Sequence, residues 1–199
     1  MKEKPEFHYD AGVGETRIHY GWDPSEQKPA LRVSTSRLTL RSLTVTQEHI
    51  SCQTAIIADS SRVAIEDCAL LSCGVTANEC DLTLTGCTLW SIPMMDCDMI
   101  VPLVSLRNTS AVLERNILTG HPYGIICDLG ASIDPACNDV WCTSENYDGC
   151  PDPTGLFGNI SADPRFVNPG EDFRLRADSP CASGATPGCG RMGAFPVAP

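Results

Sequence analysis

The sequence predicts an all-β protein, a single-stranded β-solenoid of about five or six coils with a C-terminal capping segment. Two observations carry this prediction. Four segments repeat one apolar pattern, and turn residues are plentiful while helical periodicity is missing. The 199 residues include 16 Gly and 15 Pro, scattered along the chain. No long stretch places apolar residues at the i, i+3, i+4 and i+7 spacing of an amphipathic helix.

Each repeated segment alternates apolar and polar residues, breaks phase once by one residue, and then resumes. A single strand would keep its phase, whereas two strands joined by a short bend would lose it at the bend. Such a bend often needs a left-handed backbone, which Gly86 adopts without strain. The four segments are residues 36–45, 61–70, 80–89 and 109–118.

The spacing between repeats is variable and predicts coils with loops of different length at one corner. Spacings of 25, 19 and 29 residues separate Leu38, Val63, Leu82 and Ala111, which occupy the same repeat position. A period near this length is typical of one solenoid coil, and coils stack about 4.8 Å apart. The longest insertion falls between the third and fourth repeats.

One column of equivalent residues contains Leu43, Cys68, Cys87 and Asn116. We expect Cys68 and Cys87 to stack inside the solenoid as small hydrophobic residues; a disulfide or a metal pair is the alternative. A buried Asn116 in the same column would bond to the bend backbone.

The repeats divide the chain into three parts. Residues 1–30 are expected to form an N-terminal partial coil or cap, and residues 31–135 the parallel β-helix coils. Residues 136–199 would form the last coil and a C-terminal cap with disulfide-bearing loops. We expect apolar residues of the cap, Phe166, Phe173, Leu175 and Phe195, to plug the solenoid end. If upstream coils are missing, the stretch from Leu31 to Val45 would be an open edge that favours self-association.

Charge and cysteine content indicate the class of partner and the compartment. The formal net charge is -11 with a pI of about 4.6, and the 14 Lys and Arg form no run, which argues against nucleic acid. No apolar stretch is long enough for membrane insertion. Twelve cysteines without a C-x-x-C motif favour disulfides in an oxidising compartment together with buried thiols. We therefore expect an extracellular or cell-surface protein. Because the start lacks a signal peptide, the chain is expected to be a fragment or a late start.

The repeats, with residues 114–118, resemble right-handed parallel β-helix proteins of the pectate-lyase type. The series 158–167, 172–175, 178–181 and 190–195 is similar to the closing segment of bacterial secreted or surface β-helix proteins of unassigned activity. The resemblance covers roughly residues 12–196. It implies a right-handed parallel β-helix and is weak for activity, because one fold hosts many functions.

The C-terminal cysteines are spaced for local disulfides. Cys142 and Cys150 enclose one loop, and Cys181 and Cys189 enclose a Gly-rich loop. Both pairs are predicted as disulfides, although the pairing of all twelve cysteines does not follow from the sequence.

The resemblance implies two enzyme chemistries: calcium-dependent polysaccharide lyases and glycoside hydrolases with paired carboxylates. Glu66 and Glu114 share a column two coils apart, about 9.6 Å by the coil spacing, which approaches the limit for an inverting pair. The alternative is that both are solvated residues on an outer face. Asp96 and Asp98, with Arg107 downstream, are further catalytic candidates.

Two more groups of side chains are candidate binding residues. Asp134, Asp139, Asp148 and Asp152 offer oxygen ligands of the kind that calcium prefers, and Ca²⁺ is the one cofactor the sequence indicates. A polar loop is the alternative interpretation. Trp90 and Tyr147 are candidates for stacking on sugar rings.

No Ser-His-Asp order and no H-E-x-x-H motif is found in the sequence. The sequence therefore favours a non-catalytic extracellular β-helix module, structural or glycan-binding, that is part of a longer exported protein. The alternative function is a lyase or hydrolase acting on an acidic polysaccharide.

Overall fold

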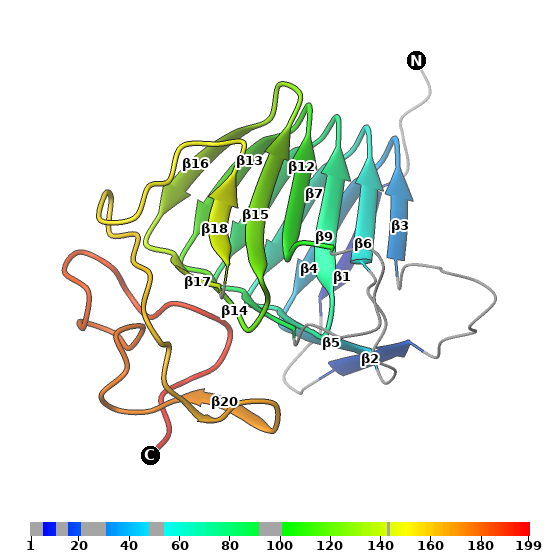
Figure 1. Ribbon diagram of the computed structural model, residues 1–199. Helices are drawn as coiled ribbons and strands as arrows, with labels where there is room; N and C mark the ends of the chain where they lie inside the picture. The colour runs from blue at the N-terminus through cyan, green and yellow to red at the C-terminus, as the bar shows by residue number, and fades with distance from the viewer. Residues whose placement is uncertain (1–5, 11–15, 21–30, 48–53, 92–100, 143) are drawn as a thin grey trace.

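The computed structural model describes residues 6–10, 16–20, 31–47, 54–91, 101–142 and 144–199. These residues form three parallel sheets of six strands each, stacked as a β-solenoid of about five turns, and a small antiparallel hairpin (Figure 1). The all-β solenoid predicted from the sequence is confirmed. No helix among the described residues is long and apolar enough to span a membrane.

The chain visits the three sheets in turn, so each group of three strands forms one rung. The first sheet contains β1 (Glu6–Asp10), β4 (Arg37–Arg41), β7 (Arg62–Glu66), β10 (Asp81–Thr85), β13 (Ser110–Glu114) and β16 (Ser132–Ala136). The second contains β2 (Thr16–Tyr20), β5 (Leu43–Gln47), β8 (Ala69–Leu71), β11 (Thr88–Trp90), β14 (Ile117–Thr119) and β17 (Asp139–Trp141). The third contains β3 (Leu31–Ser34), β6 (Thr54–Asp59), β9 (Gly74–Asn78), β12 (Val104–Arg107), β15 (Tyr123–Asp128) and β18 (Glu145–Asp148).

Strands of neighbouring rungs pair in the register that the repeats predict. Leu82 lies opposite Val63 on one side and Ala111 on the other, and Val63 lies opposite Leu38. Because a strand points alternate side chains inward, this column and the one containing Leu84 fill the solenoid interior. The apolar columns are therefore confirmed as the core.

The bend between the first and second sheets, called here the 1–2 bend, is one left-handed residue in most rungs. Ser42, Asp67, Gly86, Arg115 and Cys137 have φ between 51° and 65° there. The residue after each of them turns inward. Leu43, Cys68, Cys87 and Asn116 form the predicted column, and Asn138 continues it. Cys68 and Cys87 are buried free thiols, as predicted. The Cys87 Sγ donates to the Ile65 carbonyl at 3.2 Å.

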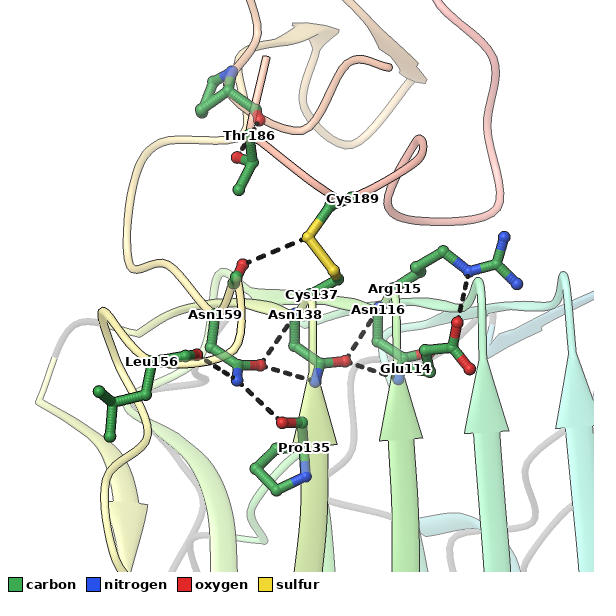
Figure 2. The surroundings of a disulfide bond; sticks show 12 residues. Glu114, Arg115, Asn116, Pro135, Cys137, Asn138, Leu156, Asn159, Thr186 and Cys189 are labelled. Carbon is green, nitrogen blue, oxygen red and sulfur yellow. Dashed lines mark hydrogen bonds and ion pairs between the residues drawn. A yellow bond between two sulfur atoms is a disulfide. The ribbon is translucent and has the colours of Figure 1, made fainter. Parts of the chain in front are cut away.

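In the later rungs this column is a ladder of hydrogen-bonded asparagines (Figure 2). The Asn116 Oδ1 accepts from the Cys87 amide at 2.9 Å, so the ladder begins on the thiol column. The Asn116 Nδ2 donates to the Asn138 Oδ1 at 2.9 Å, and the Asn138 Nδ2 donates to the Asn159 Oδ1 at 2.9 Å. All three side chains are buried. The predicted bonding of Asn116 to the bend backbone is confirmed, and it extends over two further residues.

The C-terminal segment folds back beside the solenoid. Its hairpin, β19 (Phe166–Asn168) and β20 (Asp172–Leu175), joins a second core on the outward face of the second sheet, where Ile117 and Trp90 project. Phe173 lies at its centre, with ring centroids 5.1 to 5.7 Å from those of its three aromatic neighbours, Trp90, Phe166 and Phe195. The prediction that these apolar residues plug the solenoid end was wrong. The outward apolar residues of the second sheet offer them a side face to cover.

A disulfide joins the C-terminal segment to the 1–2 bend. Cys137 pairs with Cys189, with their Cα atoms 5.6 Å apart, and Figure 2 shows this bond beside the ladder. The predicted Cys181–Cys189 pair was therefore wrong, and Cys142 and Cys150 are free thiols in the structure rather than a disulfide. The cause is the path of the segment that follows Cys189, which runs along the bend. The Gly193 amide donates to the Arg115 carbonyl at 2.7 Å.

The open edge at the N-terminal end of the solenoid does not lie along the whole stretch from Leu31 to Val45, where the sequence predicted it. β1 pairs with β4 and β2 pairs with β5, so the first two sheets continue upstream of the stretch from Leu31 to Val45. In the third sheet, β3 is the outermost described strand. Self-association through an open edge therefore stays a prediction. The strands at that edge are β1, β2 and β3, which form the first rung.

Asn138→Ala should destabilise the fold by about 2–4 kcal/mol, because it leaves the Asn116 amide and the Leu113 carbonyl buried without their partner. Urea unfolding of the two proteins measures this difference. Asn168→Ala is the matched control, because its amide lies exposed in the hairpin. Equal losses in the two variants would contradict a structural role for the ladder.

Candidate functional site

A long hollow on the described surface lies along the bend between the third and first sheets, called here the 3–1 groove. Its volume is about 1050 Å³, and it crosses five rungs. The four intervals between these five rungs, at about 4.8 Å each, make it roughly 19 Å long. The lining residues are Thr35, Ser36, Arg37, Ser60, Ser61, Arg62, Glu79, Cys80, Asp81, Asn108, Thr109, Ser110, Gly130 and Ser132.

A ladder of short polar side chains holds the floor of the groove. The Ser36 amide donates to the Ser61 Oγ at 3.3 Å, and the Ser61 amide donates to the Cys80 Sγ at 3.4 Å. The Cys80 amide in turn donates to the Thr109 Oγ1 at 3.2 Å. Each side chain also donates to the carbonyl two residues before it; for Thr109 this is Arg107, at 2.9 Å. The bend backbone is thereby bonded from rung to rung.

The walls of the groove carry charges of both signs, arranged in pairs. Arg62 lies 3.3 Å from Asp81, and both side chains are more than 60% exposed. The Ser60 Oγ donates to the Glu79 carboxylate at 3.1 Å. The groove therefore presents hydroxyl, carboxylate and guanidinium groups, which match the hydroxyl and carboxylate groups of a sugar chain.

Arg107 lies at the edge of this groove. A smaller hollow of about 410 Å³ adjoins it and is lined by Asp59, Ser60, Asn78, Glu79, Arg107 and Asn108. The Arg107 guanidinium lies 3.9 Å from the Asp128 carboxylate, and both side chains are exposed. Of the three candidates that the sequence grouped together, Asp96 and Asp98 lie outside the described residues.

Glu66 and Glu114 lie in one column on the outward face of the first sheet, with Thr85 between them. Each carboxylate forms an ion pair: Glu66 with Arg41 at 2.8 Å, and Glu114 with Arg115 at 3.2 Å. Neither lines the 3–1 groove. The structure thus confirms that Glu66 and Glu114 share a column, and it places this column outside the 3–1 groove.

The two aromatic candidates are packed into cores. Trp90 is half-buried in the second core against Phe173. Tyr147 is buried in the solenoid core at the last rung, and its hydroxyl has no hydrogen-bond partner among the described residues. Burial raises the pKa of Tyr147. Neither Trp90 nor Tyr147 lines the 3–1 groove.

The predicted calcium ligands are not brought together. Asp134 is exposed on the first sheet, Asp139 is buried on the second, and Asp148 and Asp152 are exposed at and beyond the end of β18. In the described part of the chain, no three His, Cys, Asp or Glu side chains gather closely enough to hold a metal ion. The predicted cluster was wrong because consecutive strands belong to different sheets, which face different directions.

Asp139 is a buried carboxyl between the second sheet and the C-terminal segment. It accepts from the Ala162 amide at 3.0 Å and from the Cys181 Sγ at 3.1 Å. Burial raises its pKa to about 7, which the two hydrogen bonds oppose only in part. This carboxyl holds the C-terminal segment onto the solenoid. Its burial favours the protonated form over the ionised one.

The residues of the 3–1 groove were missed as a site, although the sequence contained a signal for them. Ser36, Ser61, Cys80 and Thr109 are the first residues of the four repeats. A column of short hydrogen-bonding side chains at one repeat position indicates a bend where backbone groups need partners.

No protein-family model, curated protein or solved structure matches this chain.

Asp139→Asn should make stability less dependent on pH. A folded-state pKa near 7, against 3.8 for the free group, means that the folded protein holds this proton more tightly. The stabilisation is full below about pH 4 and is lost as the pH rises to 7, by on the order of 4 kcal/mol. Urea unfolding across this range should show the loss in the parent protein and not in Asp139→Asn.

The exposed Asp134→Asn is the matched control and should keep the parent's pH dependence. A parallel pH profile for Asp139→Asn and the parent would show that Asp139 is ionised in the folded protein, contrary to this account.

Proposed function

We propose that this chain is a non-catalytic β-solenoid module of an exported protein and that it binds a glycan chain along the 3–1 groove. The observation that carries the proposal is the groove itself, an open hollow of about 1050 Å³ that runs along the solenoid and is lined by polar side chains of five rungs. An elongated polar hollow is the shape that fits a linear polymer of hydroxylated units.

The build of the groove supports a binding role. Its floor residues are bonded from rung to rung, so binding would order few backbone atoms and lose little conformational entropy. Its paired groups, such as Arg62 and Asp81, can each exchange part of their mutual contact for a sugar hydroxyl or carboxylate. Arg62 and Arg37 supply the cationic groups that an acidic glycan would need.

The sequence supports export and a role as a β-helix module that contacts polysaccharide. Twelve cysteines, and a disulfide between distant parts of the chain, are typical of an oxidising compartment. The resemblance to right-handed β-helix proteins of the pectate-lyase type, and to the closing segment of bacterial surface proteins, favours a module that contacts polysaccharide. An acidic surface and the absence of a basic run disfavour nucleic acid.

A polysaccharide lyase is the second candidate, and the position of Arg107 at the edge of the groove favours it. A lyase of this kind needs a basic residue near the proton beside the uronate carboxylate. Arg107 is paired with Asp128, and the carboxylates Glu66 and Glu114 lie outside the groove with arginine partners. The module is therefore the better-supported function.

Affinity electrophoresis in gels that contain pectins, alginates, glycosaminoglycans or neutral glycans tests the proposal. The parent protein should be retarded by at least one glycan. The double variant Arg62→Ser, Asp81→Ser keeps the net charge and should bind about tenfold more weakly, a loss of about 1.4 kcal/mol. The matched control is Asp172→Ser, Arg174→Ser, which removes an exposed ion pair of the C-terminal hairpin.

Retardation by no glycan, or equal retardation of both double variants, would refute binding in the groove. The same glycans are incubated with the protein, with and without calcium, and unsaturated uronates are followed by ultraviolet absorbance. No release is expected. A calcium-dependent release that Arg107→Ala abolishes would replace the module with the lyase.

A further inference from the structure

Two thiols of the last two rungs lie against each other. Cys127 is on β15, and Cys150 follows β18 after Gly149. The parallel pairing of these strands sets Ile126 opposite Asp148, which places Gly149 beside Cys127. The thiols of Cys127 and Cys150 are hydrogen-bonded to each other. Both are free thiols in the structure.

Gly149 makes this approach possible. A side chain at residue 149 would collide with the Cys127 carbonyl oxygen, and the backbone there has a φ of +70°. This left-handed residue turns the next one inward, as Glu79 does before Cys80. The Cys150 Sγ lies 3.7 Å from the Asp148 carbonyl oxygen, and the Cys80 Sγ makes the same contact with Asn78 at 3.1 Å. Cys150 therefore repeats the local geometry of Cys80.

Both side chains belong to the end of the solenoid core. Cys127 is 7% exposed, and Cys150 packs against the same cluster while half-buried. Cys150 is offset by one residue from the position opposite Cys127, so a rung spacing of about 4.8 Å and a residue rise of about 3.3 Å put their Cα atoms roughly 6 Å apart, which a disulfide spans. Cys142, the other half-buried thiol nearby, points elsewhere, with its Sγ 4.0 Å from the Leu118 carbonyl oxygen.

We propose that Cys127 and Cys150 form a second disulfide, which ties the last rung to the one before it, when the protein meets a small-molecule disulfide. One thiolate attacks a sulfur of the oxidant and releases one thiol, leaving a mixed disulfide on the protein. The other cysteine then attacks the protein sulfur of that bond and releases the second thiol. The oxidant gains two electrons, and the two cysteine protons end on the two released thiols.

The mutual hydrogen bond assists the first step. The bond from Cys150 lowers the pKa of Cys127 and so favours its thiolate, which is the reactive form. Burial, and to a smaller extent the charge of Asp139, raise the pKa of Cys142 to about 12. Cys127 is therefore a better nucleophile than Cys142.

Disulfide mapping of the full chain tests the proposal. The folded protein is treated with oxidised glutathione, its remaining thiols are alkylated, and it is digested without reduction by a protease that cleaves before Asp. Cys127, Cys137, Cys142 and Cys150 then fall in different peptides, 98–127, 134–138, 139–147 and 148–151. We expect a linked pair of peptides 98–127 and 148–151, with the loss of two free thiols.

The Cys137–Cys189 link, found as peptide 134–138 joined to 178–199, is the internal standard for a folded and oxidised chain. Cys142→Ser should keep the new link, whereas Cys127→Ser and Cys150→Ser should each lose it. If the standard forms while Cys127 and Cys150 are alkylated, or if Cys150 is linked to Cys142, the proposal fails. The result does not depend on glycan binding, so it leaves the proposed function to its own test.

Discussion

The in-register pairing of each strand with the strand one turn away is the constraint on which the rest of the structure depends. It forces equivalent residues into columns, so a side chain that is suitable at one rung must be suitable between its two neighbours. In the strands these columns are apolar and fill the interior, as Leu82 does between Val63 and Ala111. In the bends the backbone turns away from the ladder of strand bonds, and its polar groups need other partners.

Two of the bends solve this problem with side-chain ladders. At the 1–2 bend, thiols give way to asparagines, each of which bonds to the backbone of the preceding rung. At the 3–1 bend, hydroxyls and a thiol play the same part with shorter side chains. The short side chains leave a hollow above the bend, so the feature that satisfies the backbone also creates the candidate binding groove.

The C-terminal segment depends on the same columns in a different way. The second sheet projects Ile117 and Trp90 outward, and the segment covers them with aromatic residues instead of covering the solenoid end. It is fixed by a disulfide to Cys137 and by bonds to Asp139, residues that lie at and just after one bend. The attachment thus combines a covalent link with a buried carboxyl whose contribution depends on pH.

The fold could be predicted because period-2 alternation with one break per repeat is a local signal, and so could the columns of Leu38, Cys68 and Asn116. The disulfide could not, because the pairing of Cys189 with Cys137 depends on the path of a segment that has no repeat. The calcium cluster failed for a related reason: Asp134 and Asp139 are near in sequence, but a bend separates their sheets. The groove could have been found from the column of Ser61, Cys80 and Thr109, since those residues open the repeats.

The asparagine ladder gives the most direct test of the stacked rungs. Hydrogen exchange of the native protein reports the amides of Cys87, Asn116 and Asn138, which donate to the asparagine side chain of the next rung. If the rungs stack as described, these bend amides should exchange as slowly as the amides of the core strands. Exchange at the rate of exposed loops would show that the bends are not held in this register and would contradict the account.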